Sequence, residues 1–473
     1  MSTISGKFNA GWTIVLLLMF FSAIAGLFID FGQNLFIMSN DHLYANIAWL
    51  ITATIFVLMM TPGLSFFYGG MVRTKNVIST MLQSFIVMGV VSVIWVVFGF
   101  SLAFGNDIFH VIGNPTDFFM LRNVGVGNVT DPTSEMSQIG IATTTIPLAL
   151  FALFQMKFAI ITPSLITGSF AERVHFAGYL LFMVLWTVIV YCPLAHCTWH
   201  PDGLFGLMDV HDYAGGIVVH AASGIAALAG ALFLGKRKNR TDSKPANVPF
   251  VLLGAALLWL GWFGFNGGSS LAADGIAISA FLNTNTAAAT AMVVWVAMDG
   301  VRGHKPSAMG AAIGAVVGLV AITPCAGWVT VGESIFISFI ITVCCNLACA
   351  WKSYSNMLDD ALDVFPTHGL GGIIGTVLTG IFAYDFFATG NPDMISRWSF
   401  FINHIIVLVM VFVYTFVMSY ALYWITDKIT PMRVSRSSEE IGLDKSQHDE
   451  EYGLETGIAE DAITADDWYR NQE

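Results

Sequence analysis

Two histidines, His220 and His368, have the clearest capacity for chemistry in this sequence. Both lie in long uncharged stretches, residues 213–235 and 364–384, which contain no Lys, Arg, Asp or Glu. A titratable ring in so apolar a segment indicates a functional role. Both stretches are rich in Gly and Ala, which lets helices pack closely in lipid. We therefore expect both rings to face protein or a lumen.

Two neutral imidazoles can act as complementary hydrogen-bonding groups. Burial in apolar surroundings disfavours the charged form of histidine, so both rings should be neutral most of the time. A neutral ring has one donor and one acceptor nitrogen, so two rings can bond to each other and still present opposite character to a passing molecule. Either histidine could instead be a satisfied core residue. Two imidazoles without Cys, Asp or Glu in motif spacing are too few ligands for zinc, so no metal and no cofactor are expected.

The composition is that of a polytopic all-α membrane protein. Of 473 residues, 56% are hydrophobic and only 11% are charged, with a mean hydropathy of +0.71, far outside the soluble range. Each apolar run is near or above the ~20 residues that a helix needs to cross the hydrocarbon layer. The runs are too long for the ~10-residue alternating strands of a β-barrel. They lie at 12–29, 45–67, 76–104, 138–170, 174–199, 213–235, 249–273, 276–298, 306–327, 334–351, 364–384 and 398–426.

The first run resembles a cleavable secretory signal. Lys7 precedes the apolar stretch 12–21, and Ala23 and Ala25 are small residues suited to cleavage. We expect residues 1–25 to be a signal peptide, which leaves eleven spans with the N-terminus outside and the C-terminus inside. The alternative is a retained twelfth helix. The basic residues fit the eleven-span arrangement, because 16 of the 20 Lys and Arg residues fall in its cytoplasmic loops and tail.

The membrane domain, residues 26–426, divides into two halves and a last helix. The halves cover about 45–235 and 249–384, and the span 398–426 follows them. Five spans per half would give inverted repeats, and such repeats place a binding site at their interface near the membrane midplane.

Each half ends in a span with one histidine, and Gly-Ile follows that histidine four residues later. The pairs are Gly224-Ile225 and Gly372-Ile373. The repeat predicts that His220 and His368 meet on the axis that relates the halves.

The tail and the cysteines carry weaker signals. Residues 427–473 hold 13 acidic and 5 basic side chains. This cytoplasmic tail is either solvated and partly disordered or docked on the cytoplasmic loops or a partner. The six cysteines lie within or at the ends of spans and form no CxxC pair, so we interpret them as packing residues.

Five segments, in order along the chain, resemble the Amt branch of the Amt/MEP/Rh ammonium transporter family. They are FFYGGMVRTKNVIS (66–79), FQMKFAIITPSLITGSFAERVHF (154–176), DYAGGIVVH (212–220), GWFGFNGGS (261–269) and DVFPTHG (363–369). The resemblance covers about residues 45–452. It implies eleven transmembrane helices in two inverted halves plus a last helix, assembled as homotrimers with one pore per subunit.

The resemblance assigns roles to particular residues. It implies an outer recruitment site for ammonium at Trp199, Phe154 and Ser269, with Asp212 beneath it as an electrostatic stabiliser. The aromatic rings would offer π faces to a cation, worth up to ~2 kcal/mol when partly desolvated. Asp212 could equally be a helix N-cap, and both roles are compatible.

Below that site the resemblance implies a gate of two stacked rings, Phe158 and Phe265, above the paired histidines. Phe154 and Phe158 are four residues apart and so share one helix face. Lys157 departs from the family pattern, because an uncharged residue is expected there. We expect its side chain to point away from Phe158, toward a subunit contact or snorkelling to the outer surface. The family's Cys near the inner histidine is Leu362 here.

The expected function is transport of ammonium or ammonia by a multi-pass protein of the cell (inner or plasma) membrane. The charged ion faces a large desolvation cost in an apolar pore, which favours deprotonation after recruitment. The alternatives are an ammonium sensor on the same fold and a Rh-type gas channel. An enzyme is not expected, because the sequence has no nucleophile or cofactor motif. A nucleic-acid partner is not expected either. The tail segment 434–453 resembles the family's cytoplasmic tail, which packs on the neighbouring subunit and, in many prokaryotic members, accompanies regulation by a PII-type protein.

Overall fold

The computed structural model describes residues 43–122, 124, 146–238, 244–355 and 358–453, together with a few isolated positions before residue 43. The predicted signal peptide therefore lies almost wholly outside the described residues. The last twenty residues of the tail lie outside them as well.

The described chain is a bundle of helices with one small hairpin. Its main α-helices are α2 (Leu43–Met71), α3 (Val77–Ile94), α6 (Leu148–Phe170), α7 (Phe176–Trp186), α8 (Cys192–Trp199), α9 (Ala222–Leu234), α10 (Val248–Gly268), α11 (Gly275–Val301), α12 (Ala308–Ile322), α13 (Val331–Ser355), α14 (Leu370–Phe382) and α16 (Arg397–Ile429). Short α-helices are α4 (Phe100–Phe104), α15 (Tyr384–Ala388) and α17 (Arg436–Ile441). Five π-helical segments extend them: η3 (Trp95–Gly99), η5 (Thr187–Tyr191), η7 (Gly216–Ala221), η8 (Phe365–Gly369) and η9 (Asp444–His448).

Ten of these helices, or joined helices, are long and apolar enough to cross a membrane in the described part of the chain. Helices suit lipid because each satisfies its own backbone hydrogen bonds. The ten fall at ten of the predicted spans. The predicted span 306–327 corresponds to α12, an apolar helix of fifteen residues (Ala308–Ile322). The multi-pass membrane architecture is thus confirmed.

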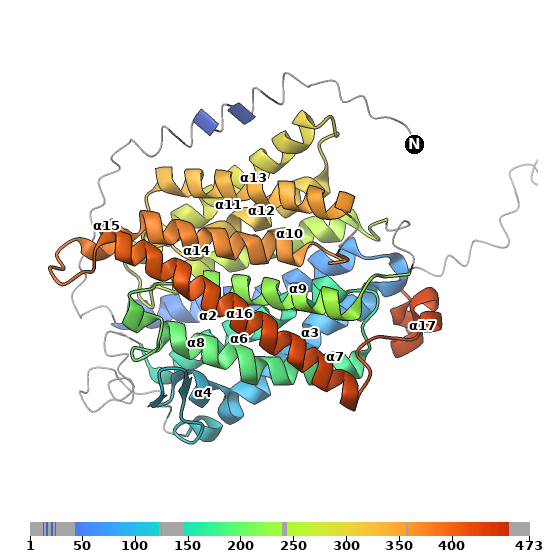
Figure 1. Cartoon of the computed structure of the whole chain (residues 1–473), viewed down its shortest axis with the longest axis horizontal. Helices are drawn as coiled ribbons and strands as arrows, with labels where there is room; N and C mark the ends of the chain where they lie inside the picture. The colour runs from blue at the N-terminus through green and yellow to red at the C-terminus, as the bar shows by residue number, and fades with distance from the viewer. Residues whose placement is uncertain are drawn as a thin grey trace, which may run out of the picture.

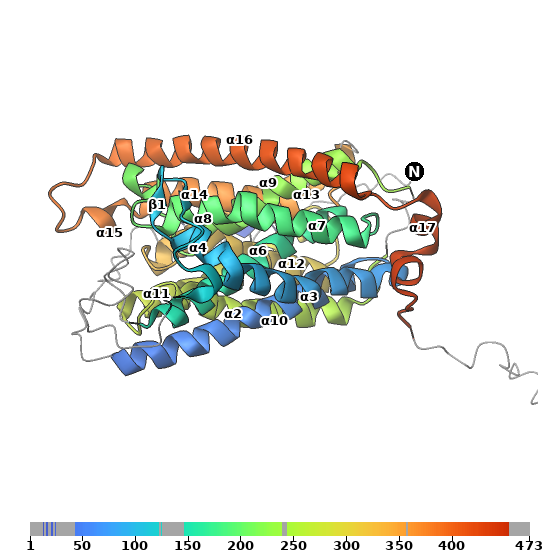
Figure 2. The same cartoon turned by 90° about the horizontal axis from the view of Figure 1, so that it is seen from below.

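The helices lie side by side, with the long α16 along one face (Figures 1 and 2). The two ends of the bundle differ. One end carries α15 and an antiparallel hairpin of β1 (Asp107–Ile108) and β2 (Ile112–Gly113), in which Asp107 pairs with Gly113. The other end carries α17, the folded part of the tail (Figure 2).

Two buried tryptophans find hydrogen-bond partners on other helices. The indole of Trp95 donates to the carbonyl of Ala152 at 2.9 Å, and that of Trp186 donates to the Ser419 hydroxyl at 3.0 Å. Such bonds let large amphipathic rings fill the interior. The six cysteines are all free, in agreement with the packing interpretation.

Candidate functional site

The two histidines predicted to meet are in contact at the centre of the bundle. His220 lies on η7 and His368 on η8, and they are 1% and 3% exposed. Their Nδ1 atoms are 3.3 Å apart, and their ring centroids are 5.3 Å apart. If both rings are neutral, one Nδ1 donates and the other accepts. The two remaining Nε2 atoms then have opposite character, one an acceptor and the other a donor.

The glycines four residues after each histidine explain how the rings approach. A Cβ on Gly224 would lie 2.1 Å from the Cα and N of Gly369, beside His368. A Cβ on Gly372 would lie 2.6 Å from the N of Ala221, beside His220. Each helix therefore uses its own glycine to pack against the backbone next to the other histidine. The repeated Gly-Ile signal in the sequence marks a reciprocal contact.

Buried carboxylates cap both histidine-bearing helices. The Oδ1 atom of Asp212 accepts from the N–H groups of Gly215 (2.8 Å) and Gly216 (2.6 Å). Its Oδ2 accepts from Ile217 (2.7 Å) and Val218 (3.2 Å). Burial raises the pKa of the Asp212 carboxyl to about 6, although these four donors oppose the rise. Asp212 therefore acts as a helix cap, one of its two predicted roles.

Asp360 is the counterpart in the second half. Its Oδ2 accepts from the N–H of Phe365 at 2.7 Å, at the start of η8. Asp360 is fully buried. It precedes His368 by eight residues, as Asp212 precedes His220. Sequence reasoning missed Asp360, although this shared spacing was a signal that could have found it.

Four aromatic rings form a column above the histidines. Phe158 and Phe265 are stacked, with centroids 4.1 Å apart and planes 19° apart. Phe154 packs edge-on against Phe158 at 5.0 Å, and so does Trp199 at 5.8 Å. Phe265 in turn lies 6.1 Å from the ring of His220. The predicted gate pair is thus in contact, between the outer aromatics and the histidines.

The remaining recruitment residues adjoin this column. Ser269 ends α10, and its hydroxyl donates to the carbonyl of Phe265 at 2.7 Å, so its oxygen lone pairs remain available to accept. The indole N–H of Trp199 donates to the carbonyl of Asp212 at 3.0 Å. Both Trp199 and Ser269 are partly exposed, whereas Phe154 and Phe158 are buried.

The space around the histidines is apolar and narrow. It is lined by Met60, Leu64, Ile161, Leu165, Val219, His220, Leu258, Trp262, Phe265, Val316 and His368, and it leaves no room for the centre of a water molecule. A second cavity, of about 20 Å³, lies on the far side of His368 and is bordered by Leu362, Asp363 and Thr367. That volume is enough for one small molecule. The path is therefore dry between the gate and the histidines.

Trp262 is a further residue of the site that sequence reasoning did not single out. Its ring stacks on His220 with centroids 5.3 Å apart and planes 17° apart. Its indole N–H donates to the hydroxyl of Thr323 at 2.8 Å, which fixes the ring. The position three residues before Phe265, on the same face of α10, was the available signal.

Lys157 does not snorkel to the outer surface. Its side chain is 9% exposed, and its Nζ lies 3.8 Å from the sulfur of Met156. Among the described residues, no carboxylate lies within ion-pair distance of its amine. Of its two predicted directions, the outer surface is therefore not the one seen, because the amine is buried beside Met156, and a subunit contact stays a prediction.

This chain is similar in sequence to known proteins. A model of the Ammonium Transporter Family matches residues 48–452. The chain is 42% identical over 410 residues to a putative ammonium transporter of Methanothermobacter thermautotrophicus, with 85% of this chain and 97% of that protein covered. It is also 42% identical to an ammonium transporter of Bacillus subtilis, with 85% and 96% covered. This chain belongs to the Ammonium Transporter Family.

Solved structures of ammonium transporters share the fold. Mep2 of Saccharomyces cerevisiae superposes with a TM-score of 0.76 at 33% identity, covering 88% of this chain and 92% of that one. A structure described as a sensor Amt protein superposes with a TM-score of 0.77 at 28% identity, covering 87% and 100%. The family resemblance inferred from the five sequence segments is therefore confirmed.

Proposed function

We propose that this chain transports ammonium across the cell membrane, with ammonia as the species that passes the pore. The observation that carries the proposal is the continuous file from Trp199 through the stacked pair Phe158 and Phe265 to the contacting histidines. Membership of the Ammonium Transporter Family supports the substrate.

Recruitment takes place at the outer end of the file. Trp199 and Phe154 offer π faces to a cation, and Ser269 offers a hydroxyl oxygen to one of its N–H groups. Asp212 lies directly behind Trp199, through the bond from the indole to its carbonyl. Its ionised carboxylate adds a favourable potential for the cation while it also caps η7.

The dry segment below the gate selects the neutral species. A charged ion there would lose its hydration without any compensating carboxylate, whereas ammonia would not. Ammonium can give up a proton and potassium cannot, so potassium is rejected. Ring motion of Phe158 and Phe265 must open the gate, because their stacked rings lie across the file.

The histidine pair then serves as a relay of hydrogen bonds. The bond between the two Nδ1 atoms leaves one Nε2 as donor and one as acceptor, so an ammonia molecule would find complementary partners once side-chain motion widens this narrow space. The ring of Trp262 holds His220 in the plane that this bond requires.

The proposed architecture is eleven spans in two inverted halves plus a last helix, with the N-terminus outside after cleavage of a signal peptide. The reciprocal glycine contacts and the equal Asp-to-His spacing support the inverted halves. α12 would be the short eleventh span. The predicted cytoplasmic basic residues Arg73, Arg237 and Lys75 lie at the end of the bundle that carries the tail.

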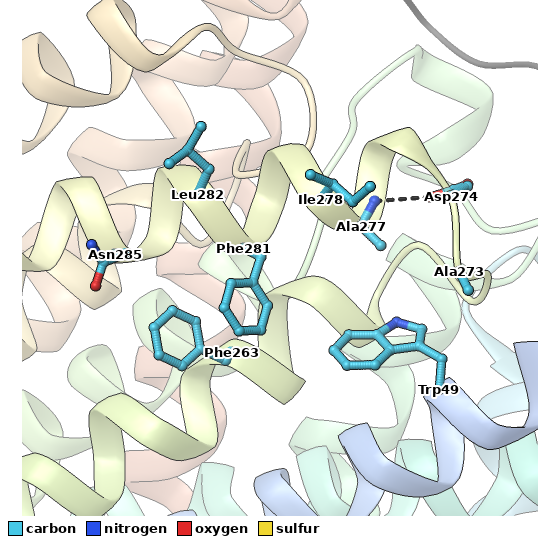
Figure 3. Close-up of a pocket in the computed structure, with 9 residues that line it drawn as sticks. All are labelled: Trp49, Phe263, Ala273, Asp274, Ala277, Ile278, Phe281, Leu282 and Asn285. Atoms are coloured by element: carbon cyan, nitrogen blue, oxygen red, sulfur yellow. Dashed lines mark hydrogen bonds between the residues drawn. The ribbon is translucent and has the colours of Figure 1, made fainter. Parts of the chain in front are cut away.

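A homotrimer is the proposed assembly. A pocket of about 690 Å³ opens on the surface of α2, α10 and α11 and is lined by mainly apolar side chains, including the stacked rings Phe263 and Phe281 (Figure 3). Two of the lining residues, Ile278 and Leu282, are 71% and 50% exposed. Subunit packing would cover such a surface.

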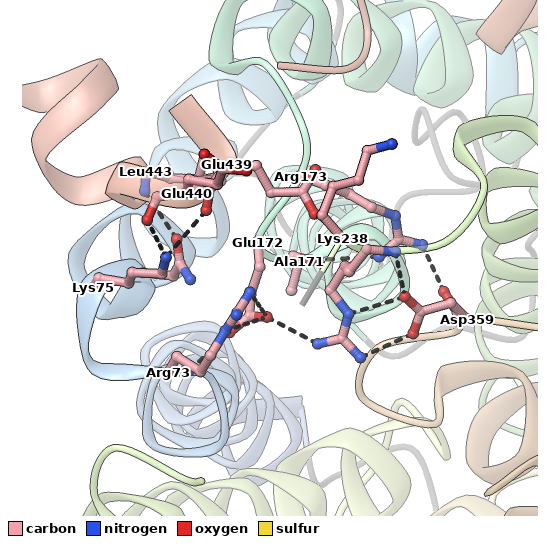
Figure 4. Close-up of polar contacts among 12 residues, drawn as sticks. Arg73, Lys75, Ala171, Glu172, Arg173, Lys238, Asp359, Glu439, Glu440 and Leu443 are labelled. Carbon is pink, nitrogen blue, oxygen red and sulfur yellow. Dashed lines mark hydrogen bonds and ion pairs between the residues drawn. The ribbon is translucent and has the colours of Figure 1, made fainter. Parts of the chain in front are cut away.

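The tail would carry regulation, with a PII-type protein as the proposed partner. Part of the tail docks on loops of its own chain: Lys75 donates to the carbonyl of Glu439 (Figure 4), and the Leu443 N–H donates to the side-chain oxygen of Asn76. Docking is thus favoured over the solvated alternative for residues 431–453. A partner bound at this face could act on the pore helices through the contacts of the tail.

A sensor is the second candidate, because a structure described as a sensor Amt protein shares the fold. Uptake of labelled methylammonium into vesicles that contain the purified protein separates the two. The wild type should take it up, and His220→Ala and His368→Ala should lower the flux or admit potassium. A folded wild type that binds ammonium without uptake would favour the sensor.

A further inference from the structure

Four buried charged side chains form a brace at the tail end of the bundle. Arg73 donates from Nε to both carboxylate oxygens of Glu172, at 3.0 Å each (Figure 4). Arg237 donates from Nη1 to Glu172 at 2.9 Å and from Nη2 to Asp359 at 2.8 Å. The four side chains are between 1% and 11% exposed. Arg237 is thus the link that joins the two carboxylates.

The brace connects four of the elements that line the dry cavity around the histidines. Arg73 follows α2, and Glu172 follows α6. Arg237 follows α9, which continues η7 in one span, and Asp359 precedes η8. The side chains that these elements supply to the cavity lining are Met60, Leu64, Ile161, Leu165, Val219, His220 and His368.

Arg237 lies in the segment between the two halves of the membrane domain, and it bonds to both of them. Glu172 belongs to the first half and Asp359 to the second. The Nε and Nη2 atoms of Arg237 bond to the two oxygens of Asp359, at 3.0 and 2.8 Å, and its backbone N–H bonds to Oδ2 at 2.8 Å. A planar guanidinium can bond in this way to two carboxylates at once, whereas the amine of a lysine cannot.

The backbone of Glu172 gives a second sign that the brace is constrained. Its φ is 71°, a left-handed conformation that is uncommon outside glycine and that persists where the surroundings fix it. Here the two arginines hold its carboxylate. Burial would raise the pKa of Asp359, but the bonds and charge of Arg237 more than offset this and hold it below the ordinary value. The pairs of the brace are therefore charged.

We propose that Arg237 is a positioning residue that keeps the pore too narrow for water, by holding together the ends of the helices around the histidines. The inference rests on the proposed transport function. The cavity beside His220 leaves no room for the centre of a water molecule, so a small separation of these helices would admit water. A cation that enters with water no longer meets the full desolvation cost. Arg237 thereby contributes to the exclusion of potassium.

This contribution passes through the helices and not through contact with the pore. Arg237 comes seventeen residues after His220, which is roughly 25 Å along a helix. The helices leave little room for adjustment between these points, because a Cβ on Gly224 would already lie 2.1 Å from the backbone of Gly369. A displacement at the brace is therefore passed on to the segments that carry the histidines.

Arg237→Lys tests the inference, because it keeps the charge but cannot bond to both carboxylates as arginine does. The loss of one hydrogen bond between charged groups shifts an equilibrium about tenfold or more. In vesicles that contain the purified full chain, we expect the ratio of potassium flux to methylammonium flux to rise about tenfold. This ratio does not depend on how much of the protein is folded, so a loss of stability alone leaves it unchanged. The half-saturating concentration of methylammonium should stay as in the wild type.

Two further variants test the two sides of the argument. Asp359→Asn removes the charge of the other partner and should raise the flux ratio as Arg237→Lys does. Arg436→Lys is the matched control, because Arg436 is also an arginine at the tail end, but it is 74% exposed and pairs with Glu440. Its flux ratio should equal that of the wild type.

A last variant separates the brace from the docked tail. Glu439 of the tail accepts from the N–H of Lys238 at 2.6 Å and does not belong to the brace. Glu439→Gln should therefore leave the flux ratio unchanged. A rise as large as that of Arg237→Lys would mean that tail docking sets the width of the pore, and would overturn the inference.

The other outcomes also bear on separate claims. A wild-type flux ratio in folded Arg237→Lys, or in folded Asp359→Asn, would overturn the inference and leave the transport function standing. An equal rise in Arg436→Lys would overturn it as well, because the effect would then not depend on the buried pairs. No methylammonium uptake by the folded wild type would overturn the transport function itself.

Discussion

The two histidine-bearing segments share one plan, but their capped ends are built differently. In each, an aspartate lies eight residues before the histidine and a glycine four residues after it. At the outer end, Asp212 uses both oxygens to bind four backbone N–H groups. At the inner end, Asp360 binds one, that of Phe365. The shared spacing of Asp, His and Gly brings the two rings together. The different caps give the two ends different properties.

The inner end is connected to a network of arginine and carboxylate side chains. Arg237 bonds to both Glu172 and Asp359, at 2.9 and 2.8 Å. Arg73 bonds to Glu172 as well (Figure 4). These residues come from four different loops at the tail end of the bundle. Asp359 is adjacent to Asp360, so the network joins the cap of the inner histidine helix to the loops on which the tail docks. In the proposed orientation, the end with Asp212 collects substrate and the end with Asp360 faces the cytoplasm.

The largest expected difference between the two ends is in the cost of losing the cap. Asp212→Ala leaves four buried N–H groups without their acceptor, and we expect it to lower the unfolding free energy by about 4 kcal/mol. Asp360→Ala leaves one and should cost about 2 kcal/mol. Thermal unfolding in detergent measures both.

Asp202→Ala is the control for the cap comparison, because its side chain is 65% exposed, and it should change the unfolding free energy little. Equal losses for Asp212→Ala and Asp360→Ala would contradict the asymmetry of the two ends.

The shared plan itself is tested by the two glycines. Gly224→Ala and Gly372→Ala each force a Cβ against backbone, and we expect each to cost about 3 kcal/mol and to reduce methylammonium uptake. The effect should be larger for Gly224, where the approach is 2.1 Å rather than 2.6 Å.

Gly89→Ala is the matched control for the glycine pair. Nothing lies within 4 Å of its added Cβ, so it should be neutral or stabilising. If only one of Gly224→Ala and Gly372→Ala were harmful, the reciprocal packing of the halves would not be what holds the histidines together.

The helices and the histidine contact could be predicted from sequence patterns, because both depend on local rules. The lengths of the apolar runs predicted the spans. The repeated His and Gly-Ile pairs predicted that His220 and His368, 148 positions apart, would touch, and their Nδ1 atoms are 3.3 Å apart. Resemblance to family motifs, rather than pattern, singled out Phe158 and Phe265 among 38 phenylalanines. Their stacking depends on how α6 packs against α10, which periodicity does not encode.

Other features were missed because they depend on contacts across loops. Glu172 and Arg237 read as ordinary polar loop residues until the fold brings them together, 65 positions apart. Snorkelling, one of the two directions predicted for Lys157, is not seen, because the direction of a long flexible side chain depends on its neighbours rather than on its depth. Asp360 was within reach of sequence reasoning, since its spacing repeats that of Asp212.

The smallest expected difference between the ends is in their response to pH. Burial raises the pKa of Asp212 to about 6, above its unfolded value of ~3.9. Burial would also raise the pKa of Glu172, but its bond to Arg73 and the charges of Arg237 and Arg73 more than offset this and hold the value below the usual range. The outer carboxylate therefore titrates between pH 5 and 7, and the inner one stays ionised.

The signs of the two contributions to stability are opposite. Asp212 favours its neutral form in the folded state, so its contribution is greatest below pH ~4 and declines as the pH rises through about 6. Glu172 contributes above its unfolded pKa of ~4.3 and loses that contribution as the pH falls through its depressed folded value.

For transport, only the outer end should respond to pH. Methylammonium stays protonated from pH 5 to 7, so a change in its half-saturating concentration reports the site and not the substrate. Ionised Asp212 attracts the cation, so we expect that concentration to be a few-fold higher at an outer pH of 5 than at 7. Glu172→Gln should keep this slope, whereas Asp212→Asn should flatten it while its amide oxygen still caps part of η7. A slope that survives in Asp212→Asn would mean that another group sets the charge of the outer site, and Asp212 would then be a cap alone.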